Sequence, residues 1–536
     1  MALDESIKVP LPRQGIVRYK SGDVVYAYYI TRIYRNKKGK PTNDRVSIGK
    51  IDNETGMLIP NKNYYEIYAK ETPIKDNDIE SIKSCGVTFL IDGQFRETGL
   101  YDVLKRKFPQ NAHKIIALAE YMLCEGNVMS YYEDWYDEVY PHNGTKLSSP
   151  EISRVFQSID YKSRMDFFKT WIYARKQHEY IVYDVTSISS YSRGIESLEW
   201  GYNRDKESLP QLNFAMYYGQ ESMLPLYYCV YPGSVPDKTH LTYMLRDNEL
   251  IGCKNVKYVL DRGFFCSDNL KYMTEAGARF IISIPNSSTF AKELIDKHRS
   301  EIVNRSECRL GKDLPYVKSV IKEDFGIRFK AHIYYSPSKA ADEENLLFED
   351  IEKCENALRQ MSEPPSRTLR YDRYFKINHK KGGGIGFIRD TEKINAIISR
   401  LGFFIIVETD FEASSYDILM TYRRRDVVEK SFDELKNELD MKRIHCHNNQ
   451  TTEGKMFVAF IALIMRSWIQ NKIKEYMSIN SISFTNILKE LRKIKYVNTK
   501  DGRKLLSPIT KKQRDIMNTC GISTDDLQAW LTKLSV

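Results

Sequence analysis

Runs of apolar, β-branched and aromatic residues in the middle of the chain constrain its fold more than any other feature. They lie at 180–189, 209–219, 224–233, 256–263 and 279–285. The segment "THLTYMLRDNEL" at 239–250 has the spacing of a helix and separates the third run from the fourth. Three consecutive strands followed by a helix and further strands indicate a mixed sheet with helices packed against it.

The sheet pattern stops after residue 285 and resumes in "LGFFIIVETD" at 401–410. Between these points, "RFKAHIYYSP" and "RYDRYFKINHKKGGGIGFIRD" predict strands on either side of a helix that begins near residue 338. We therefore expect an inserted subdomain with strands of its own. The predicted fold class is α/β, with a ribonuclease H-like mixed sheet core interrupted by a β-containing insertion.

The rest of the chain divides by the period of its apolar residues. Alternation at 16–50 predicts a small antiparallel β unit, whereas the period from about 95 to 178 is helical. The expected organisation is a basic, β-rich N-terminal domain at 1–90, a helical domain at 91–179, a core at 180–285 and 401–475, an insertion at 286–400 and a helical C-terminal region at 476–536.

The composition is that of a folded, mildly basic protein. Of 536 residues, 81 are Lys or Arg and 71 are Asp or Glu, so the net charge is +10. This small excess favours an anionic partner such as nucleic acid. The nine cysteines contain no CxxC pair, which argues against a zinc ribbon or a disulfide framework, and the N-terminus has no apolar signal segment. We expect a cytoplasmic, nucleoid-associated protein without a membrane span, in which the apolar run 457–465 is a buried helix.

The turn of the N-terminal β unit is rich in basic residues. They are Arg32, Arg35, Lys37, Lys38, Lys40 and Arg45. Such side chains are suited to contact a DNA backbone. Charged side chains also keep an exposed hairpin from aggregating, so both roles fit this segment equally.

Two aspartates come directly after runs of the predicted sheet. Asp184 follows "YIVY", and Asp261 follows "VKYVL". A carboxylate at a strand end points from a rigid sheet into the crevice at its edge, and hard divalent cations such as Mg²⁺ prefer such oxygens. A single aspartate of this kind is more often a turn or capping residue. Two on neighbouring strands predict a metal site if a third carboxylate is near.

The segment "TYRRRDVVEKSFDELK" at 421–436 supplies a third carboxylate. Four polar residues share one edge of this predicted helix: Tyr422, Arg425, Glu429 and Lys436. At roughly 100° per residue, they fall within roughly 60° of one another. An adjacent apolar stripe would dock the helix on the sheet, which puts the polar edge at the margin of the core. A surface i,i+4 pair of Arg425 and Glu429 is the simpler alternative.

The spacing Tyr-x2-Arg-x3-Glu-x6-Lys resembles the Y-R-E-K signature of bacterial insertion-sequence DDE transposases with a β-rich insertion in the core. Other stretches are similar to the same family. They are "DVTS" and "VLDRGFF" around the two aspartates, "GYNRDKESLPQLNFAMYYGQESMLPLYYCVYPGSVPD" between them, and "TTEGKMFVAFIALIM" after the signature. The resemblance extends over roughly residues 180 to 475.

This resemblance implies that Asp184, Asp261 and Glu429 form a catalytic triad that binds two Mg²⁺ or Mn²⁺ ions. It also implies that three further residues hold DNA phosphates beside the scissile bond: Tyr422, Arg425 and Lys436. The implied function is cut-and-paste transposition, in which a homodimer cleaves double-stranded DNA at the two ends of an element and joins them to target DNA.

Some members of that family form a DNA hairpin in which a flipped base stacks on an aromatic side chain. The five tryptophans lie at 135, 171, 200, 468 and 530, outside the insertion, so a Tyr or Phe such as Phe387 would have to receive the base there. Two alternatives share the predicted fold: a metal-dependent nuclease without strand transfer and a domesticated DNA-binding protein without chemistry. Retention of all three acidic residues disfavours the second.

Overall fold

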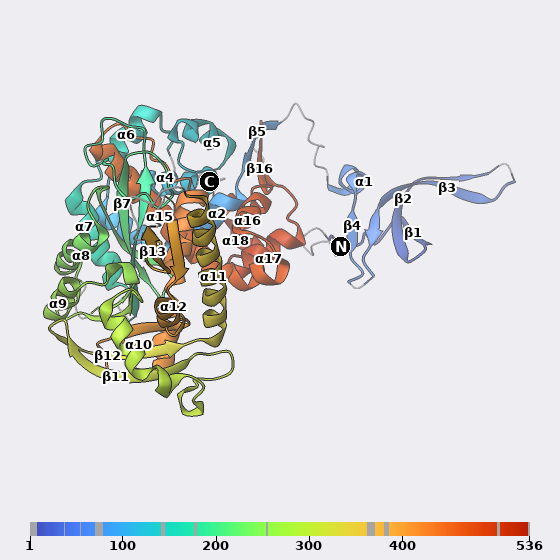
Figure 1. Cartoon of the computed structure of the whole chain (residues 1–536). Coiled ribbons are helices and arrows are strands. Elements are labelled where there is room, and N and C mark those ends of the chain that lie inside the picture. The colour runs from blue at the N-terminus through green and yellow to red at the C-terminus, as the bar shows by residue number, and fades with distance from the viewer. Residues whose placement is uncertain are drawn as a thin grey trace. The chain divides into compact units, whose positions relative to one another are not determined.

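A computed structural model describes residues 8–36, 38–53, 55–69, 79–140, 145–175, 179–252, 256–361, 370–379, 385–500 and 504–533 (Figure 1). The chain divides into two compact units. Unit 1 comprises Met1–Phe95, Glu133–Lys146 and Ile469–Val536, and unit 2 comprises Arg96–Tyr132 and Leu147–Trp468. Each unit is therefore assembled from segments that are distant in the sequence.

Unit 2 is built on an eight-stranded mixed sheet with the order β11-β12-β15-β10-β9-β6-β7-β8. The strands are β6 (Tyr180–Ser189), β7 (Gln211–Gly219), β8 (Pro225–Pro232), β9 (Lys257–Leu260), β10 (Arg279–Ile284), β11 (Tyr316–Asp324), β12 (Ile327–Tyr335) and β15 (Phe403–Glu408). β9 runs parallel to β6 and to β10, and the other neighbours are antiparallel. The predicted α/β class with a mixed core sheet is confirmed.

Helices cover both faces of this sheet. β7 is buried along its whole length, and successive side chains of a strand point to opposite faces. Phe214 meets Phe432 of α14 (Asp426–Asp433), with ring centroids 6.4 Å apart. The Tyr217 hydroxyl, on the other face, donates to the carbonyl of Met244 in α8 (Asp237–Ile251) at 3.3 Å. The middle of the sheet is therefore enclosed between these helices.

The helix α15 (Asn449–Asn480) contains the longest apolar run, and residues 456–465 are almost completely buried. Phe460 packs against Phe168 of α7 (Tyr161–Tyr173) and Tyr228 of β8. By length and composition α15 could cross a membrane, but 78% of its most apolar window is buried inside the structure, which is typical of the core helix of a soluble protein. The predicted buried helix is confirmed.

The helical period predicted for residues 95–178 is also confirmed. Its helices are α3 (Leu100–Lys107), α4 (Ala112–Glu125), η4 (Met129–Tyr131), α5 (Tyr132–Glu138), α6 (Ser149–Gln157) and α7. Further helices connect the strands of the sheet: η5 (Arg262–Phe264), α9 (Ser267–Glu275), α10 (Thr289–Ile302) and η6 (Ser306–Cys308). α13 (Ser415–Arg423) follows the last strand, β15.

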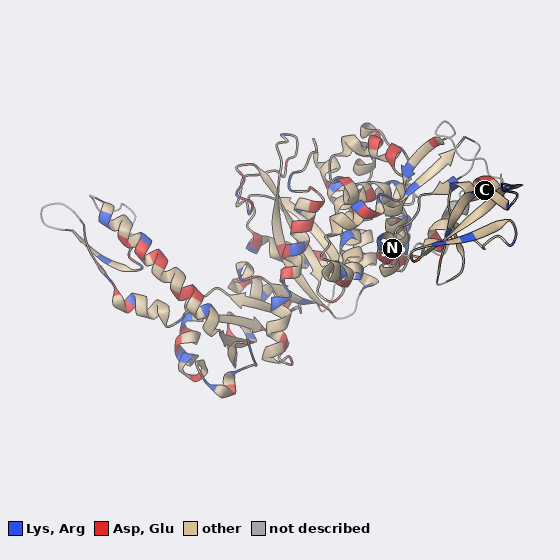
Figure 2. Cartoon of the chain, turned by 90° about the vertical axis from the view of Figure 1, so that its right-hand side faces the viewer, with Lys and Arg blue, Asp and Glu red and all other residues tan. Residues whose placement is uncertain are grey.

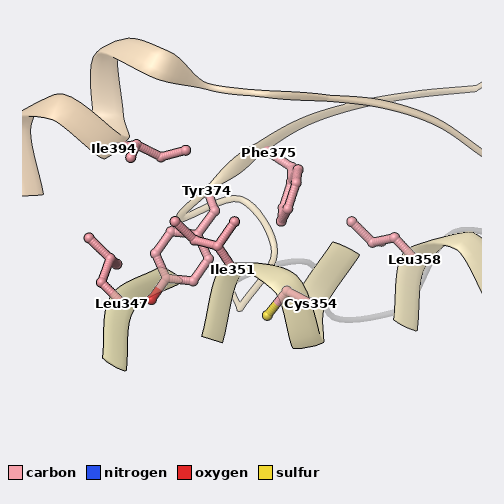
Figure 3. Packing of buried hydrophobic residues seen from close by; sticks show 7 residues of the cluster. All are labelled: Leu347, Ile351, Cys354, Leu358, Tyr374, Phe375 and Ile394. Carbon is pink, nitrogen blue, oxygen red and sulfur yellow. The ribbon is translucent and has the colours of Figure 1, made fainter. Parts of the chain in front are cut away.

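The chain between β10 and β15 forms the predicted β-containing insertion. Its first hairpin, β11–β12, extends the main sheet because β12 pairs with β15. The later elements are α11 (Pro337–Gln360), β13 (Phe375–His379), β14 (Ile385–Arg389) and α12 (Thr391–Ile398). They surround a hydrophobic cluster of their own (Figure 3), made of Leu347, Ile351, Cys354, Leu358, Tyr374, Phe375 and Ile394.

The N-terminal β unit of unit 1 is a four-stranded antiparallel sheet, as predicted. Its strands are β1 (Ile16–Ser21), β2 (Val24–Arg35), β3 (Pro41–Ile51) and β4 (Leu58–Pro60), followed by α1 (Lys62–Tyr64) and η2 (Tyr65–Ala69). Ala27, Ile48 and Leu58 form a small core on one face. Lys37 of the basic turn lies outside the described residues.

The C-terminal region of unit 1 is helical, as predicted, and contains a hairpin that the local pattern did not reveal. Its helices are α16 (Phe484–Leu491), α17 (Lys511–Thr519) and α18 (Thr524–Lys533). Most of α2 (Gly86–Glu97) belongs to the same unit. β16 (Lys495–Thr499) pairs with β17 (Lys504–Leu506) and with β5 (Ile79–Ser84). Because β5 is distant in the sequence, only the tertiary fold shows this pairing.

Candidate active site

Strands β6 and β9 bring Asp184 and Asp261 to neighbouring positions. The strands are parallel, and Tyr183 pairs with Leu260 at the last position of their register. Asp184 and Asp261 are the residues that follow Tyr183 and Leu260 in the sequence. The two carboxylates therefore lie side by side at the point where β9 ends.

The interpretation that Asp184 ends its strand is wrong. β6 continues to Ser189, because residues 184–189 pair with β7 from Met216 to Gln211. Asp261 does follow the last residue of β9 directly. The predicted run 180–189 has the same bounds as β6, so Asp184 lies inside the strand that the sequence indicates.

Glu429 is connected to this pair of aspartates through Arg425. Glu429 lies on α14, and Arg425 immediately precedes that helix. The Nη1 atom of Arg425 is 3.1 Å from Asp261 Oδ1, and its Nη2 atom is 3.1 Å from Glu429 Oε1. One planar guanidinium thus bridges a carboxylate from a strand end and a carboxylate from a helix.

The aromatic ring of Tyr422 contacts the Arg425 guanidinium. The Cζ atom of Arg425 lies 5.5 Å from the centroid of the Tyr422 ring, within the range of a cation–π contact. Burial raises the pKa of Tyr422 above its ordinary value. The hydroxyl therefore stays neutral at physiological pH and keeps its proton for donation. Tyr422, Arg425, Glu429 and the two aspartates form one connected group.

The group has more negative charge than its own cations neutralise. Burial raises the pKa of Asp184 to about 6, and the negative charge of Asp261 acts in the same direction. The amide of Val185, which donates to Asp184 Oδ1 at 2.8 Å, opposes this effect, as do the charges of Arg425 and Arg204. Because clustered carboxylates disfavour ionisation of one another, an added cation would relieve the repulsion.

The Y-R-E-K segment is not one regular helix. α13 ends at Arg423, α14 begins at Asp426, and α14 passes into the π-helix η7 (Glu434–Glu438). The Arg425 amide donates to the Tyr422 carbonyl, and the Leu439 amide donates to the Glu434 carbonyl. The first is a tight turn and the second a wide one. The assumption of a constant 100° per residue is therefore wrong for the far end of this segment.

Lys436 is separated from the other signature residues and forms a buried ion pair. Its Nζ atom is 2.6 Å from Asp205 Oδ2 in the loop between β6 and β7, and the Lys436 side chain is 9% exposed. Burial lowers the pKa of Lys436, and Asp205 opposes that shift. The ammonium is therefore engaged with protein in this structure.

Comparison with known families shows to which family the chain belongs. A family model described as "Transposase DDE domain" matches residues 175–465, which is more than half of the chain and includes all six residues singled out above. The chain belongs to the DDE transposase family. No curated protein matches this chain. Among solved structures, the cryo-EM structure of a piggyBac transposase synaptic complex with hairpin DNA aligns at 11% identity and a TM-score of 0.37, over 84% of this chain and 82% of that chain.

The transposase domain offers oxygen donors that suit a divalent cation. Asp184, Asp261 and Glu429 provide only carboxylate oxygens, which Mg²⁺ and Mn²⁺ prefer. Burial, and to a lesser extent the charge of Asp261, raises the pKa of Asp184, and a nearby cation would favour its ionised form. Within the described ranges, no three His, Cys, Asp or Glu side chains are arranged around one metal position. Here Arg425 engages two of the three carboxylates, so cation binding competes with Arg425.

Sequence reasoning missed Arg204, whose charge acts on Asp184, and two acidic residues that pair with its neighbourhood, Asp205 with Lys436 and Asp237 with Arg204 itself. Arg204 donates to Ser187 Oγ in β6 at 3.3 Å and forms an ion pair with Asp237 at the start of α8. The available signal was "NRDKE" at 203–207, which has the composition of a solvated loop. Only the fold shows that this loop returns to β6, the strand that carries Asp184.

A buried lysine holds the turn that follows the Y-R-E-K segment. The side-chain amide of Asn127 donates to the carbonyls of Asp440 and Arg443, and the ammonium of Lys455 donates to Asn127 Oδ1 at 2.8 Å. Burial lowers the pKa of Lys455 to about 8. The Lys455 side chain thus holds the turn through Asn127, although burial disfavours its charged form.

This lysine should make the transposase more stable as pH rises above 8. The unfolded chain retains the proton to about pH 10.4, whereas folded Lys455 releases it near pH 8. Between these values the unfolded state binds more protons, so the free energy of unfolding rises with pH, by about 2 kcal/mol between pH 8 and 10. Urea unfolding should show this rise in wild type relative to Lys455→Met. If the free energies of unfolding of the two proteins changed with pH in the same way, Lys455 would not be the group responsible.

Proposed function

We propose that this chain is a cut-and-paste transposase that cleaves DNA at the ends of its element and joins those ends to target DNA. The observation that carries the proposal is the Arg425 guanidinium, held between Asp261 and Glu429 beside Asp184. Metal-assisted phosphodiester cleavage uses carboxylates that hold cations, and a planar guanidinium matches the geometry of phosphate oxygens. This corner of the sheet supplies both.

The three carboxylates would hold two Mg²⁺ or Mn²⁺ ions, which when bound activate a water or a DNA 3′-hydroxyl and stabilise the leaving oxygen. Arg425 would then turn its two N–H groups from the carboxylates to a phosphate, while the Tyr422 ring keeps the guanidinium oriented. Lys436 is an ammonium in a buried ion pair, and we assign it to positioning of the β6–β7 loop through Asp205.

A strand-transfer assay tests the proposal. Wild-type protein is incubated with Mg²⁺, duplex DNA that carries the inverted repeats flanking its own element, and a supercoiled target. We expect nicked ends first and then joined product. Nicked DNA without joined product would identify a nuclease instead, and bound DNA without either product would identify a DNA-binding protein.

We further propose that two copies act together in the cytoplasm, at the nucleoid, because both ends of an element must be cut and joined in concert. The resemblance to insertion-sequence transposases supports this assembly. Analytical ultracentrifugation with end DNA should show two protein copies and two DNA ends in one complex. A complex of one protein with one end that still forms joined product would overturn the dimer.

The N-terminal sheet offers a second DNA contact. Opposite its small core, one face carries tyrosines interleaved with basic side chains: Tyr19, Tyr26, Tyr28, Arg45 and Lys50. The Arg45 guanidinium lies 5.1 Å from the Tyr28 ring centroid, and the Lys50 ammonium lies 5.9 Å from that of Tyr26. We propose that this face contacts phosphates of the DNA backbone.

The salt dependence of DNA binding tests this face. In Arg45→Gln/Lys50→Gln, the plot of log affinity against log salt should become shallower, its negative slope decreasing in magnitude by about 2. The reason is that about one condensed counterion is released for each phosphate contact. Lys62→Gln, at an exposed lysine of α1 outside this face, is the control and should keep the wild-type slope. An unchanged slope in the double variant would leave the basic residues with the solubility role only.

A further inference from the structure

The turn between β11 and β12 holds a bulky residue in a backbone conformation that costs free energy. Asp324 and Ile327 are the last paired residues of this hairpin, so the turn itself consists of Phe325 and Gly326. Both have a positive φ, +51° for Phe325 and +73° for Gly326. Such two-residue turns favour Asn-Gly, because the left-handed region disfavours side chains other than short polar ones. The turn itself therefore does not explain why Phe325 is there.

The Phe325 ring packs against three other phenylalanine rings. They belong to Phe290 of α10, Phe329 of β12 and Phe265, at centroid distances of 5.1, 6.2 and 5.5 Å. Aromatic pairs at such distances stabilise one another beyond the area that they bury. This packing offsets the strain at Phe325. Of the three partners, Phe265 is the one that belongs to the segment directly after β9.

Phe265 is part of the tight turn that begins at Asp261. Asp261 is the N-cap residue of η5, and Phe265 is the C-cap residue. The amide of Phe264 donates to the Asp261 carbonyl at 3.0 Å, and the amide of Phe265 donates to the Arg262 carbonyl at 3.2 Å. A single turn of hydrogen-bonded backbone therefore connects the Phe265 ring to Asp261.

The two consecutive phenylalanines of this turn pack against different parts of the fold. Phe264 is buried, and its ring lies 4.8 Å from that of Tyr183 in β6. Phe265 packs against Phe325 of the hairpin instead. The turn after Asp261 is therefore fixed by the central sheet through one ring and by the insertion through the other.

The later part of the insertion packs on a core of its own. Phe387, the aromatic residue that the sequence suggested for base stacking, has its ring 5.6 Å from that of Phe375 in the insertion's hydrophobic cluster. α11 carries acidic residues along much of its length, coloured red in Figure 2, and negative charge repels DNA phosphates. The contact with the turn after Asp261 comes instead from the β11–β12 hairpin, which joins the main sheet through β15.

We propose that Phe325 is a positioning residue for DNA cleavage: its ring holds the turn that begins at Asp261, and so keeps the Asp261 carboxylate in place beside Asp184. The inference rests on the proposed function for the reaction. Backbone strain persists only where the surrounding packing fixes it, and it is common at functional sites. Displacement of a reacting group by about 1 Å can slow a reaction by about 100-fold, so a ring that acts through the backbone can control the rate.

Three substitutions of Phe325 separate positioning from stability. Phe325→Asn and Phe325→Ala both remove the ring and should slow single-turnover nicking by about 10- to 100-fold. Phe325→Asn should nevertheless have the higher urea midpoint, because asparagine tolerates the left-handed conformation and alanine does not. Phe325→Tyr keeps the ring and should cleave like wild type. Ile321→Thr, at an exposed position of β11 in the same hairpin, is the matched control and should also cleave like wild type.

Hydrogen exchange gives a readout that needs neither DNA nor metal. In Phe325→Asn, the amides of residues 262–266 should exchange about 2- to 10-fold faster, which corresponds to the loss of one aromatic contact. The amides of β9 should exchange as in wild type. Phe265→Ala/Phe325→Asn should cleave no more slowly than the slower single variant, because both substitutions remove the same contact. Mass spectrometry of peptides from the labelled protein measures the exchange.

The outcomes separate this inference from the proposed function. Cleavage rates of the asparagine and alanine variants that follow their stabilities would give Phe325 a folding role only and overturn positioning, as would unchanged exchange at 262–266. If wild type cleaves DNA and Phe325→Asn cleaves at the same rate, only the positioning inference fails. A wild-type protein that does not cleave end DNA overturns the proposed function, and the positioning inference with it, even where exchange at 262–266 becomes faster.

Discussion

Asp184→Asn, Asp261→Asn and Glu429→Gln are each expected to slow DNA cleavage by about 10³-fold, equivalent to about 4 kcal/mol of activation free energy. Each substitution keeps the shape of the side chain and removes one anionic oxygen from the group around Arg425. Single-turnover nicking of end DNA with Mg²⁺ measures the rate. DNA binding should persist in all three variants, since the N-terminal sheet and Arg425 remain.

A carboxylate on the same helix provides the matched control. Asp426 lies one turn before Glu429 on α14, is exposed, and pairs with Lys430 at 2.8 Å instead of with Arg425. Asp426→Asn should therefore nick and join DNA at close to the wild-type rate. Equal losses in Asp426→Asn and Glu429→Gln would show a general effect of charge on this helix, and normal cleavage by Glu429→Gln would remove Glu429 from the site.

Lys436→Met is expected to lower the free energy of unfolding by about 2 to 3 kcal/mol. The substitution leaves the Asp205 carboxylate, which is 23% exposed, without its ammonium partner in a mostly buried position. Breaking such a pair costs more than the pair contributes, because the remaining charge stays desolvated. Urea unfolding monitored by circular dichroism measures the loss.

A second substitution distinguishes support of the fold from DNA contact. Lys436→Met/Asp205→Leu removes both charges and should recover most of the lost stability. Lys430→Met, at an exposed lysine of the same segment, should leave stability within about 0.5 kcal/mol of wild type. Normal stability of Lys436→Met combined with weaker DNA binding would instead return Lys436 to the phosphate-contacting residues that the family resemblance implied.

A local pattern predicted the pairing of Arg425 with Glu429 but not the position of Lys436. Arg425 and Glu429 are four residues apart, and a helical turn brings such residues together whatever surrounds them. Lys436 is eleven residues from Arg425, so its direction depends on every intervening turn. The tight turn at Arg425 and the wide turn at η7 change that direction, and neither leaves a mark in the spacing of apolar residues.

The aspartates illustrate the same limit on the strands. The apolar runs before Asp184 and Asp261 predicted two strands that are neighbours in a mixed sheet. The register that puts the carboxylates side by side, with Tyr183 opposite Leu260, depends on hydrogen bonds between segments far apart in the chain. No single run contains that information.

By itself, the sequence determined the fold class, the insertion, the two strand aspartates and the Arg425–Glu429 pair, because each depends on local periodicity or on a motif of fixed spacing. Only the tertiary structure decided that Arg204 contacts Ser187 of β6 and that Lys436 pairs with Asp205. These features arise where the β6–β7 loop folds back onto the sheet and the Y-R-E-K segment. Contacts between distant segments are set by packing and hydrogen bonding of the whole domain, which local composition does not encode.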